Sequence, residues 1–320
     1  MNLYKSLIFI LYLGIFLGSG FRTPAQSRDS ITLYGTLDTV QVIRQRIQHA
    51  NEANAGARVT HISPAILQAN KTRSLAELLT DHTSIYIKSL GTGALSTASF
   101  RGTSASQTRV NWNGINITPP LSGTFDFSQI PVFFTDNINL YYGSSHVKNG
   151  TGAIGGSVNL FTDTDWNRGV NGRVLAEYGS YNTYTVGGQA NISGNKSASK
   201  TRLYYQHSDN DYTYLNKVLT NIPFREKRQD AAYSQFGIMQ EGYFRVSPYT
   251  RLTAVAWYQK NHRNLPQPLG VVNRSQEDQE ENNFRGYAGL DFSRGIHELH
   301  VKAAWLYFCQ TYDIRYDGGL

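Results

Sequence analysis

The sequence is short of cysteine and of long apolar runs. Its 320 residues include a single cysteine, Cys309, so no disulfide can form within the chain. That cysteine lies far from the N-terminus, which excludes a lipidated cysteine there. The apolar segment at residues 7–17 is too short to span a bilayer as a helix. A mean hydropathy of −0.40 also excludes a bundle of apolar membrane helices.

Residues 7–17 instead have the layout of a secretory signal. They follow Lys5, and small residues suited to signal peptidase come soon after them, around Thr23–Ala25. We expect residues 1–25 to be removed on export. An uncleaved anchor is the alternative, and the length of the segment argues against it.

The positive charge does not indicate a nucleic-acid partner. The net charge is +7, but the basic residues form no stripe. They occur in short patches such as Arg225–Arg228, and the largely acidic run 277–281 opposes them. Solvated loops explain such patches. For an exported chain, the lipid and anionic lipopolysaccharide of an outer membrane are more natural neighbours than nucleic acid.

Residues 26–56 form a polar leader, and a compact α+β unit follows at residues 57–165. Two helix starts are visible: Ser63 precedes a proline and caps one helix, and Ser74 with Glu77 fits a capping box. We expect short strands between turn residues at 85–88, 99–101, 108–112 and 138–142. The unit is therefore a small mixed domain and not a doubly wound sheet.

Beyond Gly169 apolar and polar residues alternate with the period of a β-strand. Val170 and Val174 share one face of the first such segment, and Asn171 and Arg173 share the other. About seven strands fit in the remaining length, many reaching the ~9–11 residues of a tilted membrane-spanning strand. An open sheet in lipid would leave its edge amides unpaired, and barrels that hold a plug have roughly 22 strands. We therefore expect this chain to be the N-terminal part of a longer protein.

Alternating strands also suit a soluble antiparallel sandwich, but two features favour a membrane barrel. The 21 tyrosines gather near strand ends, as in interfacial aromatic girdles. Short connections (Gly179–Ser180, Ser293–Gly295) alternate with long ones (Asp209–Asp230, Lys260–Asn282), as periplasmic turns and outer loops do. The sequence thus predicts a small α+β plug domain followed by an antiparallel transmembrane β-barrel.

The sequence offers little catalytic chemistry. Residues 150–155 match the dinucleotide pattern G-x-G-x-x-G, but a strand-like run, 156–161, follows where a phosphate-binding helix is needed. His297 and His300 would face opposite sides of a strand and cannot readily share a metal. With no nucleophile elbow and no paired carboxylates, we expect no catalytic residues, no metal site and no cofactor.

Three groups of residues together resemble the plug motifs of the TonB-dependent outer-membrane receptors. They are Phe100–Gly102, the segment Val110–Ile115 with its Asn-Gly turn, and the glycine-rich stretch 138–159. The resemblance implies a plug at residues 57–165 and the first part of a barrel at 166–320. It also implies a location in the outer membrane of a Gram-negative-type bacterium.

In this family, charged motif residues tie the plug to the barrel wall. The resemblance assigns plug–barrel contact to Arg101, Gly102, Gly143, Gly155 and Gly156. At the glycines a Cβ would clash where the backbone passes close to a wall or turns with positive φ. Asn139 and Tyr142 depart from the family, which has an acidic residue and an arginine there. Arg101 must then find a different carboxylate, or the plug is held less firmly.

The resemblance also implies an energising partner. The candidate TonB box consists of Asp38, Thr39, Val40, Gln41 and Val42. This extended patch would pair by strand addition with TonB, which works with an energising complex in the inner membrane. The alternative is a disordered leader that contains a β-prone patch by chance.

The solute would bind from outside, on plug loops and outer barrel loops. The candidate ligand contacts are Leu95, Leu121, Phe125, Tyr212 and Tyr214. The layout from Arg101 to Pro131 is most similar to that of cobalamin receptors, and iron-siderophore receptors come next. Receptors that import sugars or peptides are further alternatives.

Two other classes of protein are also alternatives. A non-transporting outer-membrane barrel or adhesin would share the strands but would not need a TonB box. A secreted sandwich-fold hydrolase would need clustered acid, base or nucleophile residues, which the sequence does not show.

Overall fold

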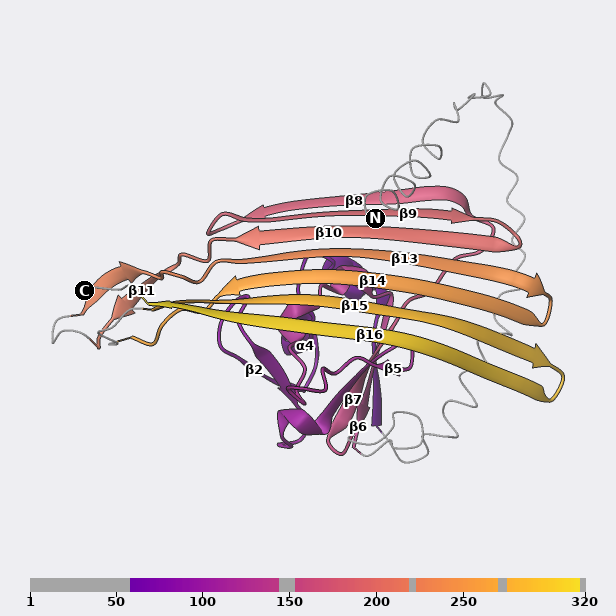
Figure 1. The fold of residues 1–320 in the computed structure, drawn as a ribbon, viewed down its shortest axis with the longest axis horizontal. Helices are drawn as coiled ribbons and strands as arrows, with labels where there is room; N and C mark the ends of the chain where they lie inside the picture. The colour runs from indigo at the N-terminus through magenta and orange to yellow at the C-terminus, as the bar shows by residue number, and fades with distance from the viewer. Residues whose placement is uncertain (1–57, 144–152, 219–222, 270–274, 317–320) are drawn as a thin grey trace, which may run out of the picture. The chain divides into compact units, whose positions relative to one another are not determined.

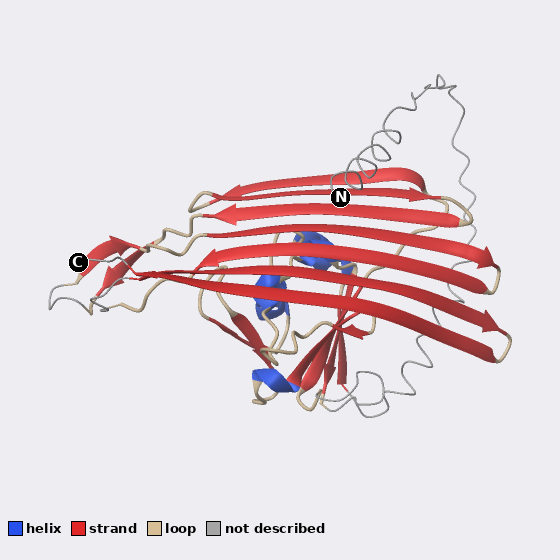
Figure 2. Ribbon diagram, viewed as in Figure 1, coloured by secondary structure: helices blue, strands red, loops and turns tan. Residues whose placement is uncertain are grey.

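The computed structural model describes residues 58–143, 153–218, 223–269 and 275–316. The candidate signal and the candidate TonB box fall outside these residues. Within them the chain forms a small mixed domain, which lies against one face of a large antiparallel sheet (Figures 1 and 2). No helix in these ranges is long and apolar enough to cross a membrane.

The mixed domain is called the plug below, and the large sheet is called the wall. The plug comprises β1 (Arg58–Ile62), α3 (Pro64–Ala69), α4 (Leu75–His82), β2 (Tyr86–Ser89), β3 (Ser96–Ser99), η1 (Ala105–Gln107), β4 (Thr108–Trp112), β5 (Ile115–Asn116), η2 (Phe127–Gln129), η3 (Val132–Phe134), β6 (Asn137–Tyr142) and β7 (Gly156–Phe161). The wall comprises β8 (Gly169–Gly179), β9 (Thr183–Ser193), β10 (Ser197–Ser208), β13 (Tyr233–Ser247), β14 (Thr250–Asn264), β15 (Ser275–Arg294) and β16 (His297–Tyr316). A separate hairpin consists of β11 (Thr213–Asn216) and β12 (Phe224–Lys227).

Both predicted helix starts are confirmed. Ser63 caps α3, its side chain accepting a hydrogen bond from Ile66 N, with a proline in the first turn. At α4 the Ser74 hydroxyl accepts from Glu77 N at 3.3 Å, and the Glu77 carboxylate accepts from Ser74 N at 2.8 Å. The two bonds satisfy amides that have no partner within the helix.

The plug sheet has the order β1-β6-β7-β4-β5, in which β4 and β7 are parallel and the other neighbours antiparallel. The predicted Asn113–Gly114 turn is confirmed, with φ of +50° and +83°, the left-handed conformation that a two-residue hairpin turn requires. The predicted strand at 99–101 is wrong. Arg101 and Gly102 have φ of +50° and +78° and form a turn, so β3 ends at Ser99.

The wall is a seven-stranded antiparallel sheet in which chain neighbours are sheet neighbours, from β8 at one edge to β16 at the other. This confirms the number of strands expected from the alternation. The strands have 11 residues in β8 and 20 residues in β15 and β16. These lengths are sufficient for a tilted strand to cross a bilayer.

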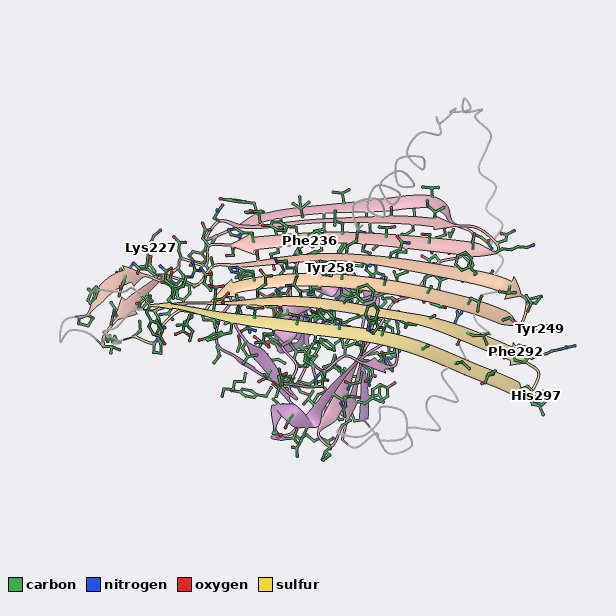
Figure 3. All side chains as sticks on the ribbon, in the orientation of Figure 1. Lys227, Phe236, Tyr249, Tyr258, Phe292 and His297 are labelled. Carbon is green, nitrogen blue, oxygen red and sulfur yellow. The ribbon has the colours of Figure 1, made fainter. Side chains whose placement is uncertain are left out.

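The wall turns apolar side chains outward and polar side chains toward the plug. On the outer face Val174 is 82% exposed, and Figure 3 labels two further outer-face side chains, Phe236 and Tyr258. On the inner face Arg202 and Glu241 have no exposed surface. A soluble sandwich has the opposite arrangement, because burying apolar surface away from water drives its folding. The inverted polarity is that of a barrel wall in lipid.

Long connections and short turns lie at opposite ends of the wall, with one correction to the sequence prediction. The connections after β10 and β14 lie at the left of Figure 1, and the turns after β13 and β15 lie at the right. The prediction that Gly179–Ser180 lies with the short turns is wrong, because β8 has already reached the long-loop end there. Tyr181 O accepts from Asp209 N at 3.0 Å, and Asn182 Nδ2 donates to Asp209 Oδ2 at 3.1 Å. These bonds join the turn to the long connection.

A lysine on the outer face tests the orientation of the wall. Ile238 is 41% exposed near the middle of β13, and we expect Ile238→Lys to destabilise the folded barrel by about 2–4 kcal/mol, because the charge would lie within hydrocarbon. Val246→Lys, near the end of the same strand, should cost about 0–1 kcal/mol. Equilibrium unfolding from lipid vesicles measures both values. Equal costs at the two depths would contradict this orientation.

Candidate functional site

The plug packs against the inner face of the wall through a buried aromatic cluster. Phe134 of η3 lies between Trp257 of β14 and Tyr204 of β10, at ring-centroid distances of 5.3 and 6.1 Å. Gly237 of β13 leaves room for this ring, since a Cβ there would lie 2.6 Å from Phe134 Cζ. Trp112 of β4 adds a second contact, 5.4 Å from Trp257. The cluster fixes the plug against three wall strands.

Beside the aromatic rings lies a buried group of charges. We call it the Asp136 cluster, and its members are Lys71, Asp136, Lys200, Arg202 and Glu241. Asp136 Oδ2, just before β6, accepts from Lys200 Nζ at 2.9 Å and from Arg202 Nη2. Arg202 also donates to Phe133 O at 3.1 Å and lies 3.3 Å from the carboxylate of Glu241. A plug carboxylate is thus held by cations of the wall.

Burial and the neighbouring charges shift the pKa values of the plug members of this cluster. Burial alone would raise the pKa of the Asp136 carboxyl, but Arg202, Lys200 and Lys71 outweigh burial and hold that pKa well below its usual range. Burial lowers the pKa of the Lys71 amine to about 7, although the charge of Asp136 opposes this effect. Lys71 Nζ donates to two plug carbonyls. Asp136 is therefore ionised at neutral pH.

The glycines predicted to contact the barrel have their closest contacts inside the plug. A Cβ on Gly155 would lie 2.1 Å from Thr103 Oγ1. One on Gly156 would lie 2.6 Å from the carbonyl oxygen of Tyr141. Gly143 has a φ of +86° with open space around it, so its conformation and not its packing favours glycine. Contact of these glycines with the barrel stays a prediction.

The motif positions that depart from the family are neutral and make plug contacts. Tyr142 is buried, and the guanidinium of Arg101 lies 6.0 Å from the centre of its ring. Arg101 and Gly102 are exposed on their turn. Asn139 Oδ1 lies 2.7 Å from His61 Nδ1 of β1. Among the described residues, the ion pairs between plug and wall are made by Asp136 and Asp126 and not by these motif positions.

A second polar contact holds the plug segment Asp126–Gln129 at the long-loop end of the wall. Asp126 Oδ2 accepts from Arg263 Nη1 of β14 at 2.7 Å. Its Oδ1 accepts from Ser96 N at 3.0 Å. Gln279 Oε1 of β15 accepts from the Nε and Nη2 atoms of Arg263, which fixes the guanidinium. One carboxylate thereby connects two plug segments to β14.

Wall amides bind the backbone of the same segment. Gln235 Nε2 of β13 donates to Ser128 O at 2.9 Å, and Gln259 Nε2 of β14 donates to Gln129 O. All four residues are at least nine-tenths buried. Because buried carbonyl groups need donors, these side chains replace the water that a free loop would bind.

The plug loop Leu90–Thr97 also touches the wall. Gly93 has a φ of +70°, and a Cβ there would lie 2.2 Å from the ring of Tyr233. Thr92 O accepts from Asn210 Nδ2 at 3.0 Å. Next to this contact lies a cavity of about 160 Å³ that α4, the loop and two wall strands line. The loop and the wall therefore enclose a polar space at the plug boundary.

The predicted ligand contacts on the plug differ in exposure. Leu121 is 95% exposed at the tip of its loop, and Leu95 is 38% exposed. Phe125 is only 4% exposed and packs edge-on against Phe127, with the ring centroids 5.1 Å apart. The ring of Phe125 is therefore part of the core beneath the loop and, contrary to the sequence prediction, is not placed to contact a ligand.

The two predicted tyrosines lie on the long connection after β10. Their rings are 6.4 Å apart, and the hydroxyl of Tyr214 donates to Glu226 Oε2 at 3.0 Å, while Tyr212 stays partly exposed. Tyr214 lines a cavity of about 510 Å³ between this connection and the one after β14. Arg228 Nη2 donates to Gln267 O at 3.2 Å and joins the two connections. The cavity has room for a small solute.

No motif or spacing in the sequence indicates the contacts of Asp126, Gln129 and Asp136 with the wall. Alternation in the wall strands does signal that Arg202 and Arg263 face inward, but it does not identify their partners. In the described ranges, no group of three or more His, Cys, Asp or Glu side chains could hold a metal ion.

Comparison with protein families identifies the plug. Residues 51–157 match the family described as TonB-dependent Receptor Plug Domain. The Vitamin B12 transporter BtuB of Photobacterium profundum is 32% identical over 135 residues, which are 42% of this chain and 22% of that protein. BtuB of Vibrio cholerae is 32% identical over 126 residues, 39% of this chain and 20% of that protein. The aligned region thus spans about a fifth of these curated relatives.

Solved structures with the same fold include two bacterial receptors. The siderophore receptor PiuA of Acinetobacter baumannii has a TM-score of 0.61 at 18% identity, covering 80% of this chain and 37% of that one. The alcaligin outer-membrane receptor FauA of Bordetella pertussis also has a TM-score of 0.61, at 14% identity, covering 82% and 40%. The likeness shows the fold of a plug followed by antiparallel barrel strands.

Asp136→Asn tests the charged contact. A carboxyl with a lowered folded-state pKa stabilises the fold above its unfolded pKa, near 3.9, and this stabilisation is lost as pH falls. The variant removes the carboxylate that Lys200 and Arg202 share, so we expect a loss of about 3–5 kcal/mol at neutral pH. The difference from wild type should shrink below about pH 4. Thermal unfolding of the purified protein at neutral and acidic pH measures it.

Asp165→Asn is the control, because the Asp165 side chain is 65% exposed and its pairing with Arg168 lies at the surface. Its effect should stay within about 0.5 kcal/mol. A difference for Asp136→Asn that does not change with pH would contradict the assignment.

Proposed function

We propose, from the premise that this chain belongs to the TonB-dependent outer-membrane receptors, that the protein binds a scarce extracellular solute and imports it into the periplasm. The observation that carries the proposal is the plug, held against the polar inner face of a wall whose outer face is apolar. One aromatic cluster and a few polar contacts supply this hold, so the plug can close a pore and still be moved.

The energy would come from the inner membrane through TonB. The segment Asp38–Val42 would add as a strand to TonB, so main-chain hydrogen bonds provide the grip. At about 1 kcal/mol net for each bond, such a pairing is weak at equilibrium but can transmit a pull along the strand. No bond in the solute is made or broken, so the protein is not an enzyme.

Cobalamin is the solute that we propose first. The support is the 32% identity, over 135 and 126 residues, with two proteins described as Vitamin B12 transporters. The exposed Leu121 and the outer cavity of about 510 Å³ beside Tyr214 offer apolar and hydrogen-bonding surface at the outer end. An iron siderophore is the alternative, supported by the fold shared with PiuA and FauA.

A non-transporting barrel or adhesin is the second alternative. Such a protein would need no movable plug. The ion pairs Asp126–Arg263 and Asp136–Arg202 favour transport. Burying charges costs desolvation free energy, so apolar packing would fill a permanently closed barrel at lower cost.

Deletion of residues 38–43 tests the proposed energy coupling. In the full-length receptor, the deletion should abolish energy-dependent uptake of radiolabelled cyanocobalamin while binding at the cell surface stays within about twofold, because the outer site lies elsewhere. A leader of equal length in which these residues are replaced by Gly and Ser should behave like the deletion. Unchanged uptake in both variants would favour the adhesin.

Competition assays distinguish the two solutes. Unlabelled cyanocobalamin should displace the label from the purified receptor, whereas a ferric siderophore should not. Displacement by the ferric siderophore alone would overturn the cobalamin assignment and support the alternative.

A further inference from the structure

The side chain of Gln129 is a primary carboxamide bound at the boundary between plug and wall. Its Oε1 accepts a hydrogen bond from Asn261 Nδ2 of β14 at 3.2 Å. Its Nε2 donates to Glu281 Oε1 of β15 at 2.6 Å. The wall therefore presents one donor and one acceptor that together satisfy a carboxamide group.

Other amides of the wall hold this donor and acceptor in place. Gln259 Nε2 lies 3.3 Å from Asn261 Oδ1, and Gln279 Nε2 donates to Glu281 Oε1 at 2.5 Å. Asn261 is only 6% exposed. Two neighbouring strands thus fix Asn261 and Glu281 without help from the plug, so the site persists when Gln129 leaves it.

The site lies where an incoming solute would meet the plug. Gln129 ends the segment that continues directly from the exposed loop around Leu121. The wall residues lie in the halves of β14 and β15 toward the long connections. A void of about 10 Å³, the size of one water molecule, adjoins Gln129, Asn261 and Glu281. The contact is therefore close to the outer site and not packed solid.

We propose that Asn261 and Glu281 form an inner subsite for a primary carboxamide of the solute, and that Gln129 fills this subsite until the solute arrives. The inference rests on the proposed import function and names the chemistry of the solute at this step. The corrin ring of cobalamin carries primary carboxamides, whereas a catecholate iron chelate carries none. Exchange of one carboxamide for another keeps the wall donor and acceptor paired, so it avoids the cost of an unsatisfied buried group.

The exchange also gives the solute a means of loosening the plug. Once Gln129 is displaced, the segment Asp126–Gln129 keeps its contacts through Asp126 and the backbone but loses its side-chain hold on β14 and β15. Solute binding and plug release are then linked, because the solute and the Gln129 side chain compete for Asn261 and Glu281.

Removal of the competing carboxamide tests the proposal. In the purified full-length receptor without TonB, Gln129→Ala should bind cyanocobalamin about five- to tenfold more tightly, because the solute no longer displaces an internal group. Gln129→Met should show the same gain, since it keeps the side-chain volume without the polar atoms. Adding Asn261→Leu to either variant should cancel the gain. Equilibrium dialysis measures each dissociation constant.

Gln240→Ala is the matched control, because Gln240 lies on the exposed outer face of β13. It should bind cyanocobalamin like wild type. Unchanged or weaker binding by both Gln129→Ala and Gln129→Met, with wild-type unfolding temperatures, would overturn the subsite and give Gln129 a purely structural role. If wild type and control also fail to bind cyanocobalamin, that result contradicts the proposed cobalamin function and, with it, the proposed subsite.

Discussion

The inward polarity of the wall is the constraint on which the rest of the structure depends. A strand in lipid has to keep its apolar side chains outward, and the buried arginines Arg202 and Arg263 accordingly lie on the inner face. Buried there, each needs a partner. The plug supplies the partners through Asp136 and Asp126, one beside the aromatic cluster and one at the long-loop end. The plug and the wall therefore satisfy each other's buried charges.

Features set by local geometry could be predicted from the sequence. The box of Ser74 with Glu77 and the Asn113–Gly114 turn need only residues close together in the chain, and both appear as expected. The wall strands followed from alternation because side chains on a strand change face at every residue. Plug and barrel are likewise arranged as the motif resemblance implied, with the plug family matching residues 51–157.

Contacts between distant parts of the chain could not be predicted in this way. Alternation gives the face of a strand but not its register, so nothing in the sequence pairs Gln129 with Asn261. Loop aromatics are similarly ambiguous: Phe125 was expected to face the ligand, yet its ring is buried. The Gly179–Ser180 turn was placed at the wrong end because its short length does not reveal the direction of β8.

The position of β1 determines the order in which the plug would yield to tension. β1 is an edge strand of its sheet, and among the described residues it pairs with β6 alone, by a ladder from Arg58↔Tyr142 to Ile62↔Ile138. A force that lifts Arg58 first would peel this ladder one pair at a time toward Ile62, the end nearest Asp136. Tension would thus reach the Asp136 cluster last, after β1 had already separated from β6.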